Sequence, residues 1–235
     1  VTFAYDETKT ILKDVSFTVN PGESVALVGP TGAGKSTIVN LISRFYNVNG
    51  GKVLIDDQDI ADVTIHSLRA QMGIMMQDSF IFSGTIADNI RYGKLDATQE
   101  EIEKAGKIVC ADPFIREMPK GYETQVRERG SILSQGQKQL ISFARTLLCD
   151  PAILILDEAT SSIDVQTEKA LQTGLNRMLK GRTSFIIAHR LSTIRGCDKI
   201  MYIDDGGIAE AGTHEELMKK NGRYYKLYTA QKSLH

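Results

Sequence analysis

The chain has 235 residues, and its 28 lysines and arginines against 29 aspartates and glutamates give a formal net charge of −1. This balance argues against a general nucleic-acid binder, which carries a basic excess, and a hydrophobic share of 42% argues against a disordered chain. No apolar run approaches the ~18–20 residues that a membrane-spanning helix needs, so we predict no such helix.

The first part of the chain predicts short strands and then a strand that leads into a helix. Apolar residues alternate with polar ones over 1–19, which is typical of half-buried strands. After a Pro-Gly turn, an apolar strand is predicted at 23–28, with further short strands at 53–55 and 73–76. Between them, apolar residues recur at the spacing of a helix face: Ile38, Leu41, Ile42 and Phe45.

The middle of the chain, from about 85 to 148, has helical periodicity and few strand features. Thr98 and Thr213 are each followed three residues later by a glutamate, which predicts two helix N-termini with capping boxes. An apolar stripe predicts a helix over 137–148. Apolar runs typical of strands return at 152–156, 184–188 and 199–203.

Buried apolar strands that alternate with helices predict an α/β fold with a mostly parallel sheet covered on both faces. We also expect an N-terminal antiparallel β subdomain. We therefore expect a single domain over 1–235, in which 1–78 and 149–235 form the core with its β subdomain and 79–148 form an inserted helical subdomain.

A glycine-rich loop between the predicted strand and helix fits the pattern G-x-x-x-x-G-K-[ST] in full. It reads Gly29-Pro30-Thr31-Gly32-Ala33-Gly34-Lys35-Ser36-Thr37. Glycines let backbone N–H groups approach phosphate oxygens, and the following helix adds its positive end. Lys35 is expected to neutralise the β- and γ-phosphates and Ser36 to bind Mg²⁺. The alternative is a glycine-rich turn that happens to precede a helix, but the complete pattern in this context favours phosphate binding.

Two carboxylates, Asp157 and Glu158, end the apolar strand predicted at 152–156. Because ligands of open parallel sheets bind beyond the carboxyl ends of the strands, these side chains are candidates for the site. Asp157 is expected to hold Mg²⁺, and Glu158 to accept a proton from, or polarise, an attacking water. The alternative is a solvated pair of charges, which is the weaker interpretation beside a phosphate loop.

Further motifs resemble those of the ATP-binding cassette (ABC) proteins. Residues 133–137, Leu-Ser-Gln-Gly-Gln, resemble the LSGGQ signature and precede the acidic pair, as they do in that family. The resemblance covers nearly the whole chain and includes Tyr5 as the aromatic residue under adenine, Gln77 as the Q-loop glutamine, Ser161-Ser162-Ile163-Asp164 as the D-loop, and His189 as the switch histidine. It implies a phosphate-loop ATPase core.

The resemblance implies a role for each of these residues. Tyr5 would stack on adenine, Gln77 would touch Mg²⁺ or the lytic water, His189 would hydrogen-bond the γ-phosphate, and Asp164 would act at a subunit contact. The alternative for Tyr5 is an aromatic residue of a half-buried strand, the alternative for Gln77 is a surface amide, and the alternative for His189 is a structural histidine. The implied catalytic residues are Lys35, Gln77, Glu158 and His189, and the implied metal ligands are Ser36, Gln77 and Asp157.

Ser134 and Gly136 precede the helix predicted at 137–148, so their N–H groups and the serine hydroxyl could bind a γ-phosphate. The resemblance implies that this phosphate belongs to ATP on the phosphate loop of a second nucleotide-binding domain, identical or different. Two such domains would hold two ATP molecules head to tail. Hydrolysis would then remove the charge that holds the two halves together.

Two segments, 77–86 and 124–130, resemble those of ABC exporters. The resemblance implies a transmembrane domain on the N-terminal side and a place at the cytoplasmic face of a membrane. Because the chain begins at Val1 rather than Met, we expect it to be a piece of a longer protein. The sequence departs from the family pattern at two positions. Gln135 replaces the first glycine of the signature, and Arg127 replaces the first glycine of the TxVGERG pattern that segment 124–130 resembles.

The leading interpretation is therefore the Mg²⁺-dependent ATPase domain of an ABC exporter, with no nucleic-acid partner. One alternative is a cassette that dimerises around ATP but barely hydrolyses it, which the presence of Glu158 and His189 disfavours. Another is a soluble ABC ATPase that is not coupled to transport. The exporter-like segments, the near-neutral charge and the lack of a long coiled-coil insertion disfavour that alternative.

Overall fold

The computed structural model describes residues 1–6, 9–76, 79–127, 130–158 and 163–233. The chain divides into two compact units. Unit 1 comprises Val1–Met72, Ile155–Glu158 and Thr183–His235, and unit 2 comprises Gly73–Leu154 and Ala159–Arg182. No helix among the described residues has both the length and the apolar character to cross a membrane. The helical subdomain predicted at 79–148 lies within the range of unit 2, and its boundaries stay a prediction.

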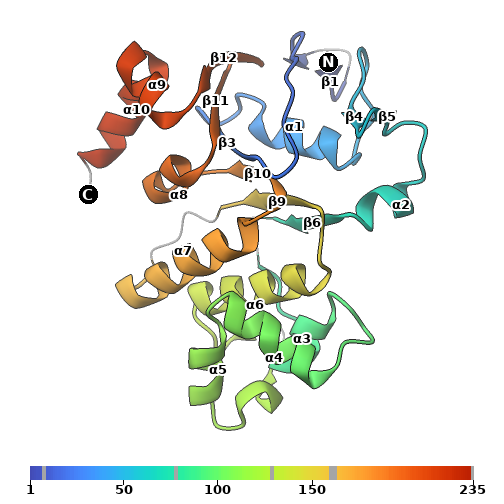
Figure 1. The fold of residues 1–235 in the computed structure, drawn as a ribbon, viewed down its shortest axis with the longest axis vertical. Helices are drawn as coiled ribbons and strands as arrows, with labels where there is room; N and C mark the ends of the chain where they lie inside the picture. Colours follow the sequence, from blue (N-terminus) through green and yellow to red (C-terminus); the bar gives the residue numbers. More distant parts are fainter. Residues whose placement is uncertain (7–8, 77–78, 128–129, 159–162, 234–235) are drawn as a thin grey trace. The chain divides into compact units, whose positions relative to one another are not determined.

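Six strands form the main sheet, in the order β12-β11-β3-β10-β9-β6 (Figure 1). They are β3 (Ser24–Val28), β6 (Met72–Met75), β9 (Ile153–Asp157), β10 (Thr183–Ile187), β11 (Lys199–Asp204) and β12 (Gly207–Gly212). Strand β3 pairs in parallel with both β10 and β11, whereas β12 pairs antiparallel with β11. All five residues of β3 are buried, as expected of an apolar strand inside a parallel sheet. The predicted α/β class with a mostly parallel sheet is confirmed.

The N-terminal part of unit 1 contains two small antiparallel pairs, β1 (Phe3–Ala4) with β2 (Thr10–Leu12) and β4 (Leu54–Ile55) with β5 (Gln58–Asp59). The alternation predicted to continue through residue 19 is present in the burial of the side chains, but residues 13–20, all of them described, form no strand. The backbone of Val15 instead exchanges two 2.8 Å hydrogen bonds with Val1. The sequence pattern therefore predicted the buried face correctly, but the strand that it predicted over 13–19 is absent.

The helices of unit 1 lie between strands or follow the last strand along the chain. They are α1 (Lys35–Ile42), α2 (Ile65–Arg69), α8 (Leu191–Gly196), α9 (His214–Lys220) and α10 (Arg223–Lys232). Helix α1 follows the glycine-rich loop directly and buries its apolar face. The predicted capping box of Thr213 with Glu216 opens α9, and the residue that follows its last turn, Asn221, has the left-handed conformation.

Unit 2 is mainly helical, and three of its described helices pack against α6 while α5 packs against α4 (Figure 1). They are α3 (Ile86–Arg91), α4 (Gln99–Ile108), α5 (Asp112–Glu117), α6 (Gln135–Leu148) and α7 (Val165–Leu179), with a 3-10 turn at Gly121–Glu123 and a short antiparallel pair of β7 (Gly84–Thr85) and β8 (Gln125–Val126). Helix α6 contacts α3, α4 and α7. The predicted capping box of Thr98 with Glu101 opens α4.

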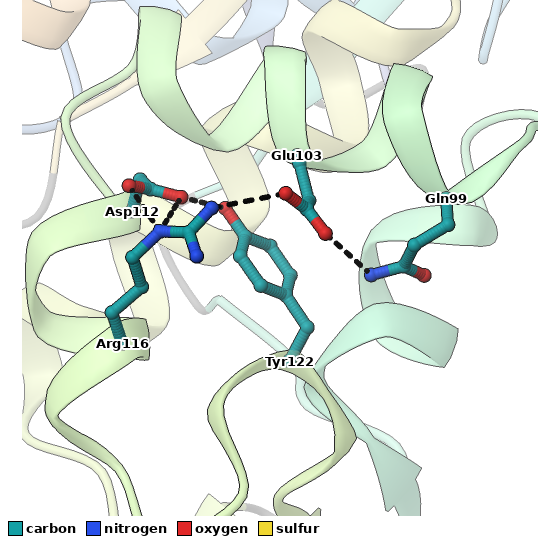
Figure 2. A network of polar contacts seen from close by, with 5 residues as sticks. All are labelled: Gln99, Glu103, Asp112, Arg116 and Tyr122. Atoms are coloured by element: carbon teal, nitrogen blue, oxygen red, sulfur yellow. Dashed lines mark hydrogen bonds and ion pairs between the residues drawn. The ribbon is translucent and has the colours of Figure 1, made fainter.

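A polar network joins α4, α5 and the 3-10 turn within unit 2, as Figure 2 shows. Arg116 Nε donates to both oxygens of Asp112 at 3.0 and 2.8 Å, and its Nη2 donates to Glu103 at 3.0 Å. Tyr122 donates its hydroxyl proton to Asp112 at 2.9 Å, and Gln99 donates to Glu103 at 3.2 Å. Burial, followed by the hydrogen bond to Asp112, raises the pKa of Tyr122, so the phenol remains the donor in this network.

Candidate nucleotide-binding site

The phosphate loop, residues 29–37, follows the carboxyl end of β3 and includes the first three residues of α1. Gly29 has φ of 134°, and a Cβ there would lie 2.1 Å from the backbone oxygen of Ile203 in β11. Gly34, the N-cap of α1, has φ of 108°, and a Cβ there would lie 2.8 Å from Leu12 Cδ2. Both positions therefore need glycine, because a side chain would meet a neighbour as well as a strained backbone.

Lys35 is the first residue of α1, and its ammonium group lies over the loop that precedes it. Its Nζ donates to the backbone oxygens of Gly29 and Pro30, both at 2.8 Å, and the residue is only 8% exposed. Burial lowers the pKa of Lys35, while the negative charge of Asp157 opposes that shift. The loop thus holds a positive charge where a phosphate group would bind, and its carbonyl partners can be exchanged for phosphate oxygens.

Asp157 and Glu158 follow each other at the end of β9, but their carboxylates have different surroundings. Burial raises the pKa of Asp157, and the positive charges of His189 and Lys35 oppose that shift. The Asp157 carboxylate therefore interacts electrostatically with the lysine of the phosphate loop. Glu158 is 4% exposed, and its Oε2 accepts hydrogen bonds from the backbone N–H groups of His189 at 2.9 Å and Arg190 at 3.0 Å. The predicted acidic pair is therefore divided between two environments.

Tyr5 presents an exposed aromatic ring beside the phosphate loop. The residue is 47% exposed, and its hydroxyl shares a 3.1 Å hydrogen bond with Oγ1 of Thr37, the last residue of the loop. The rings of Phe3 and Tyr46 each lie 4.9 Å from the ring of Tyr5 in edge-on geometry. Two edge contacts and a hydrogen bond hold this ring, so a flat apolar ligand could stack on it.

The residues predicted to bind a second ATP belong to unit 2. Ser134 is the N-cap of α6 and closes a capping box with Gln137, while Gly136 is buried. A Cβ on Gly136 would lie 2.3 Å from Thr167 Cγ2, so this signature glycine is fixed by close packing against α7. Gln135 is the first residue of α6, where ordinary helical angles suffice, which explains why a glycine can be replaced there.

Unit 1 brings together the phosphate loop with Tyr5, Asp157, Glu158 and His189. Ser134, Gly136 and Asp164 belong to unit 2, where Asp164 is the N-cap of α7 and accepts from Thr167 N at 2.9 Å. Gln77, Ser161 and Ser162 lie outside the described residues.

Ser36 and Asp157 present oxygen atoms that could bind a magnesium ion. Among the described residues, no group of three or more His, Cys, Asp or Glu side chains could hold a metal ion. Mg²⁺ keeps several waters and is usually bound through one or two carboxylates together with substrate phosphates. The exposed hydroxyl of Ser36 and the half-buried carboxylate of Asp157 are ligands of that kind.

Sequence reasoning missed Thr193, which donates its hydroxyl proton to Glu158 Oε1 at 2.5 Å. No motif marks this threonine, and helix α8 was not predicted. Its closeness in sequence to His189 is the one feature that could have drawn attention to it, because His189 precedes the N-cap of α8 and Thr193 is the third residue of that helix.

The chain is similar to known proteins of one family. The family described as ABC transporter matches residues 12–161. The uncharacterized ABC transporter ATP-binding protein YfiC of Bacillus subtilis is 54% identical over 231 residues, which are 98% of this chain and 38% of that protein. The probable multidrug resistance ABC transporter ATP-binding/permease protein YheH of Bacillus subtilis is 52% identical over 99% of this chain and 34% of that protein.

A solved structure of a bacterial Atm1-family ABC exporter with ATP bound has a TM-score of 0.91 and 46% sequence identity to this chain. The similarity covers 98% of this chain and 40% of that one. The chain thus spans less than half the length of the curated relatives and the exporter that it matches.

Proposed function

The chain belongs to the ABC transporter family, and we propose that it is the ATP-hydrolysing motor domain of an ABC exporter. It binds ATP with Mg²⁺, pairs head to tail with a second nucleotide-binding domain, and drives transport by an attached transmembrane domain. Its place is the cytoplasmic face of a membrane. The observation that carries this proposal is the phosphate loop, in which the buried Lys35 donates from Nζ to the backbone oxygens of Gly29 and Pro30 at 2.8 Å.

Nucleotide binding follows from the groups that unit 1 presents. Tyr5 stacks on adenine, the loop amides surround the phosphates, and Lys35 exchanges its two carbonyl partners for oxygens of the β- and γ-phosphates. Ser36 and Asp157 would hold Mg²⁺, which supplies neutralisation of phosphate charge when bound. The relatives named ATP-binding/permease proteins support this reading of the site.

Hydrolysis requires a water whose oxygen bonds to the γ-phosphorus while the bond from that phosphorus to the β-phosphate oxygen breaks. Glu158 accepts the proton that the water loses, and the products are ADP and phosphate. His189 donates a hydrogen bond to a γ-phosphate oxygen, and Gln77 contacts the metal or the water. The charge that builds on the transferred group is stabilised by Lys35 and the loop amides.

The second domain, identical or different, completes each site through its signature residues. Ser134 and Gly136 stand at the N-terminus of α6, where N–H groups and a hydroxyl can bind the γ-phosphate of ATP held by the partner. Asp164 acts at the subunit contact. ATP shared in this way holds the two domains together, and hydrolysis weakens the contact.

The proposal is tested by calorimetric titration of ATP with Mg²⁺ into the chain and its Lys35→Ala variant. The wild-type chain should bind ATP, and the variant should bind at least about a hundredfold more weakly, because a buried charge-assisted contact to phosphate is lost. Equal affinities would contradict the assignment of the loop.

A further inference from the structure

The carboxylate of Glu158 is held by three donors from one segment, residues 189–193. His189 N and Arg190 N donate to Oε2 at 2.9 and 3.0 Å, and Thr193 Oγ1 donates to Oε1 at 2.5 Å. The Nε of Arg190 also lies 3.9 Å from Oε1. Thr193 is 2% exposed and Glu158 4% exposed, so these bonds are shielded from water.

These bonds have a local cause at the start of α8. Arg190 is the N-cap of α8, so His189 and Arg190 are the two residues that directly precede the helix. Their backbone amides donate to Glu158, which directly follows β9. Thr193, the third residue of α8, adds its hydroxyl to the same carboxylate.

A carboxylate held in this way is a poor general base. It has about four acceptor positions, of which the three donors occupy three. A general base needs an oxygen within about 2.6–3.2 Å of the water it activates.

We propose that Thr193 is a positioning residue that holds Glu158 in a resting rotamer, which must be released before ATP is hydrolysed. The inference rests on the proposed role of Glu158 as the base. The hydroxyl of Thr193 and the backbone amide of His189 bind the same carboxylate, so a movement of the His189 segment also moves Glu158. Contact of His189 with a γ-phosphate is thereby coupled to release of the base.

Removing the hydroxyl should favour the released rotamer and so raise the hydrolysis rate. Thr193→Val keeps the shape of the side chain and should raise kcat about tenfold, the equivalent of about 1.4 kcal/mol, with KM for ATP changed less than about twofold. Thr193→Ser restores the hydroxyl and should return kcat to the wild-type value. A merely structural role would lower the melting temperature without raising kcat.

The experiment measures steady-state phosphate release from ATP and Mg²⁺ by the wild-type chain and the two Thr193 variants, with thermal denaturation of each. Thr229→Val is the matched control, because it removes a hydroxyl that donates to Tyr225 O at 2.8 Å inside α10. That control should keep the wild-type kcat. If Thr193→Val does not fold, Thr193→Ala removes the same hydroxyl with less bulk and carries the same expectation.

A kcat of Thr193→Val or Thr193→Ala at or below the wild-type value, in a folded variant, would overturn the inference while leaving the proposed function intact. A rise that Thr193→Ser shares would also overturn it, because the hydroxyl would then not be the cause. A wild-type chain whose phosphate release is unchanged by Glu158→Gln would instead refute the proposed catalytic role itself. The two failures are therefore distinguishable.

Discussion

Replacing Gly29 by alanine should destabilise unit 1 far more than replacing a glycine with a similar backbone requirement elsewhere. At φ of 134° the added Cβ would lie 2.1 Å from the oxygen of Ile203, a backbone atom that cannot rotate away. A residue forced into a sparsely populated conformation costs about 1–3 kcal/mol, and overpacking against fixed atoms costs about 1–3 kcal/mol more. The expected loss in the free energy of unfolding is thus about 2–6 kcal/mol.

Gly22 is the matched control, because its φ is 77° and a Cβ there would meet nothing within 4 Å. Gly22→Ala should therefore lose only the conformational part, about 1–2 kcal/mol. Urea denaturation of both variants measures the difference, and calorimetric titration of ATP measures whether the displaced loop of Gly29→Ala binds phosphate at least about tenfold more weakly. Equal losses of stability would refute the reasoning that contact with Ile203 fixes this glycine.

Ser134→Arg should abolish ATP-dependent dimerisation, because a bulky side chain replaces the hydroxyl at the N-terminus of α6. Sedimentation of the Glu158→Gln chain with and without Ser134→Arg measures the dimer fraction. Equal dimer fractions for the two chains would contradict the head-to-tail arrangement. Tyr5→Ala should weaken ATP binding about tenfold or more, because stacking of a base on an aromatic ring is worth about 1–3 kcal/mol. Tyr5→Phe keeps the ring, loses only the hydrogen bond to Thr37, and should retain most of the affinity. Calorimetry that ranks the two Tyr5 variants equally would exclude stacking as the role of this residue.

The parts of the fold that follow from short-range patterns could be predicted from the sequence. The apolar run ending at Val28, the glycine-rich loop and the helix that begins at Lys35 are adjacent in the chain, so their order already implies their geometry. The capping boxes at Thr98 and Thr213 are equally local, because both partners lie within one helical turn.

Contacts between distant segments could not be predicted in the same way. Val15 has the spacing of a strand residue, but its backbone partner is Val1, which no periodicity indicates. The bond from Thr193 to Glu158 joins two residues 35 positions apart, and it depends on how β9 ends beside α8. The need for glycine at position 136 likewise comes from Thr167 on another helix.

The proposed coupling between γ-phosphate contact and release of Glu158 gives the site a two-state character. One state has the carboxylate bound to the start of α8, as the structure shows, and the other has it available to water. A ligand shifts such an equilibrium only by its difference in affinity for the two states. Here that difference would come from contact between His189 and the phosphate that is to be removed.

The central claim, that this chain hydrolyses ATP with Glu158 as the base, is tested most directly by phosphate release from the wild-type chain and its Glu158→Gln variant, each with ATP binding measured by calorimetry. The account predicts that the variant binds ATP as the wild-type chain does and releases phosphate at least about a hundredfold more slowly, in line with the loss of a general base. Phosphate release by the variant at the wild-type rate would contradict it.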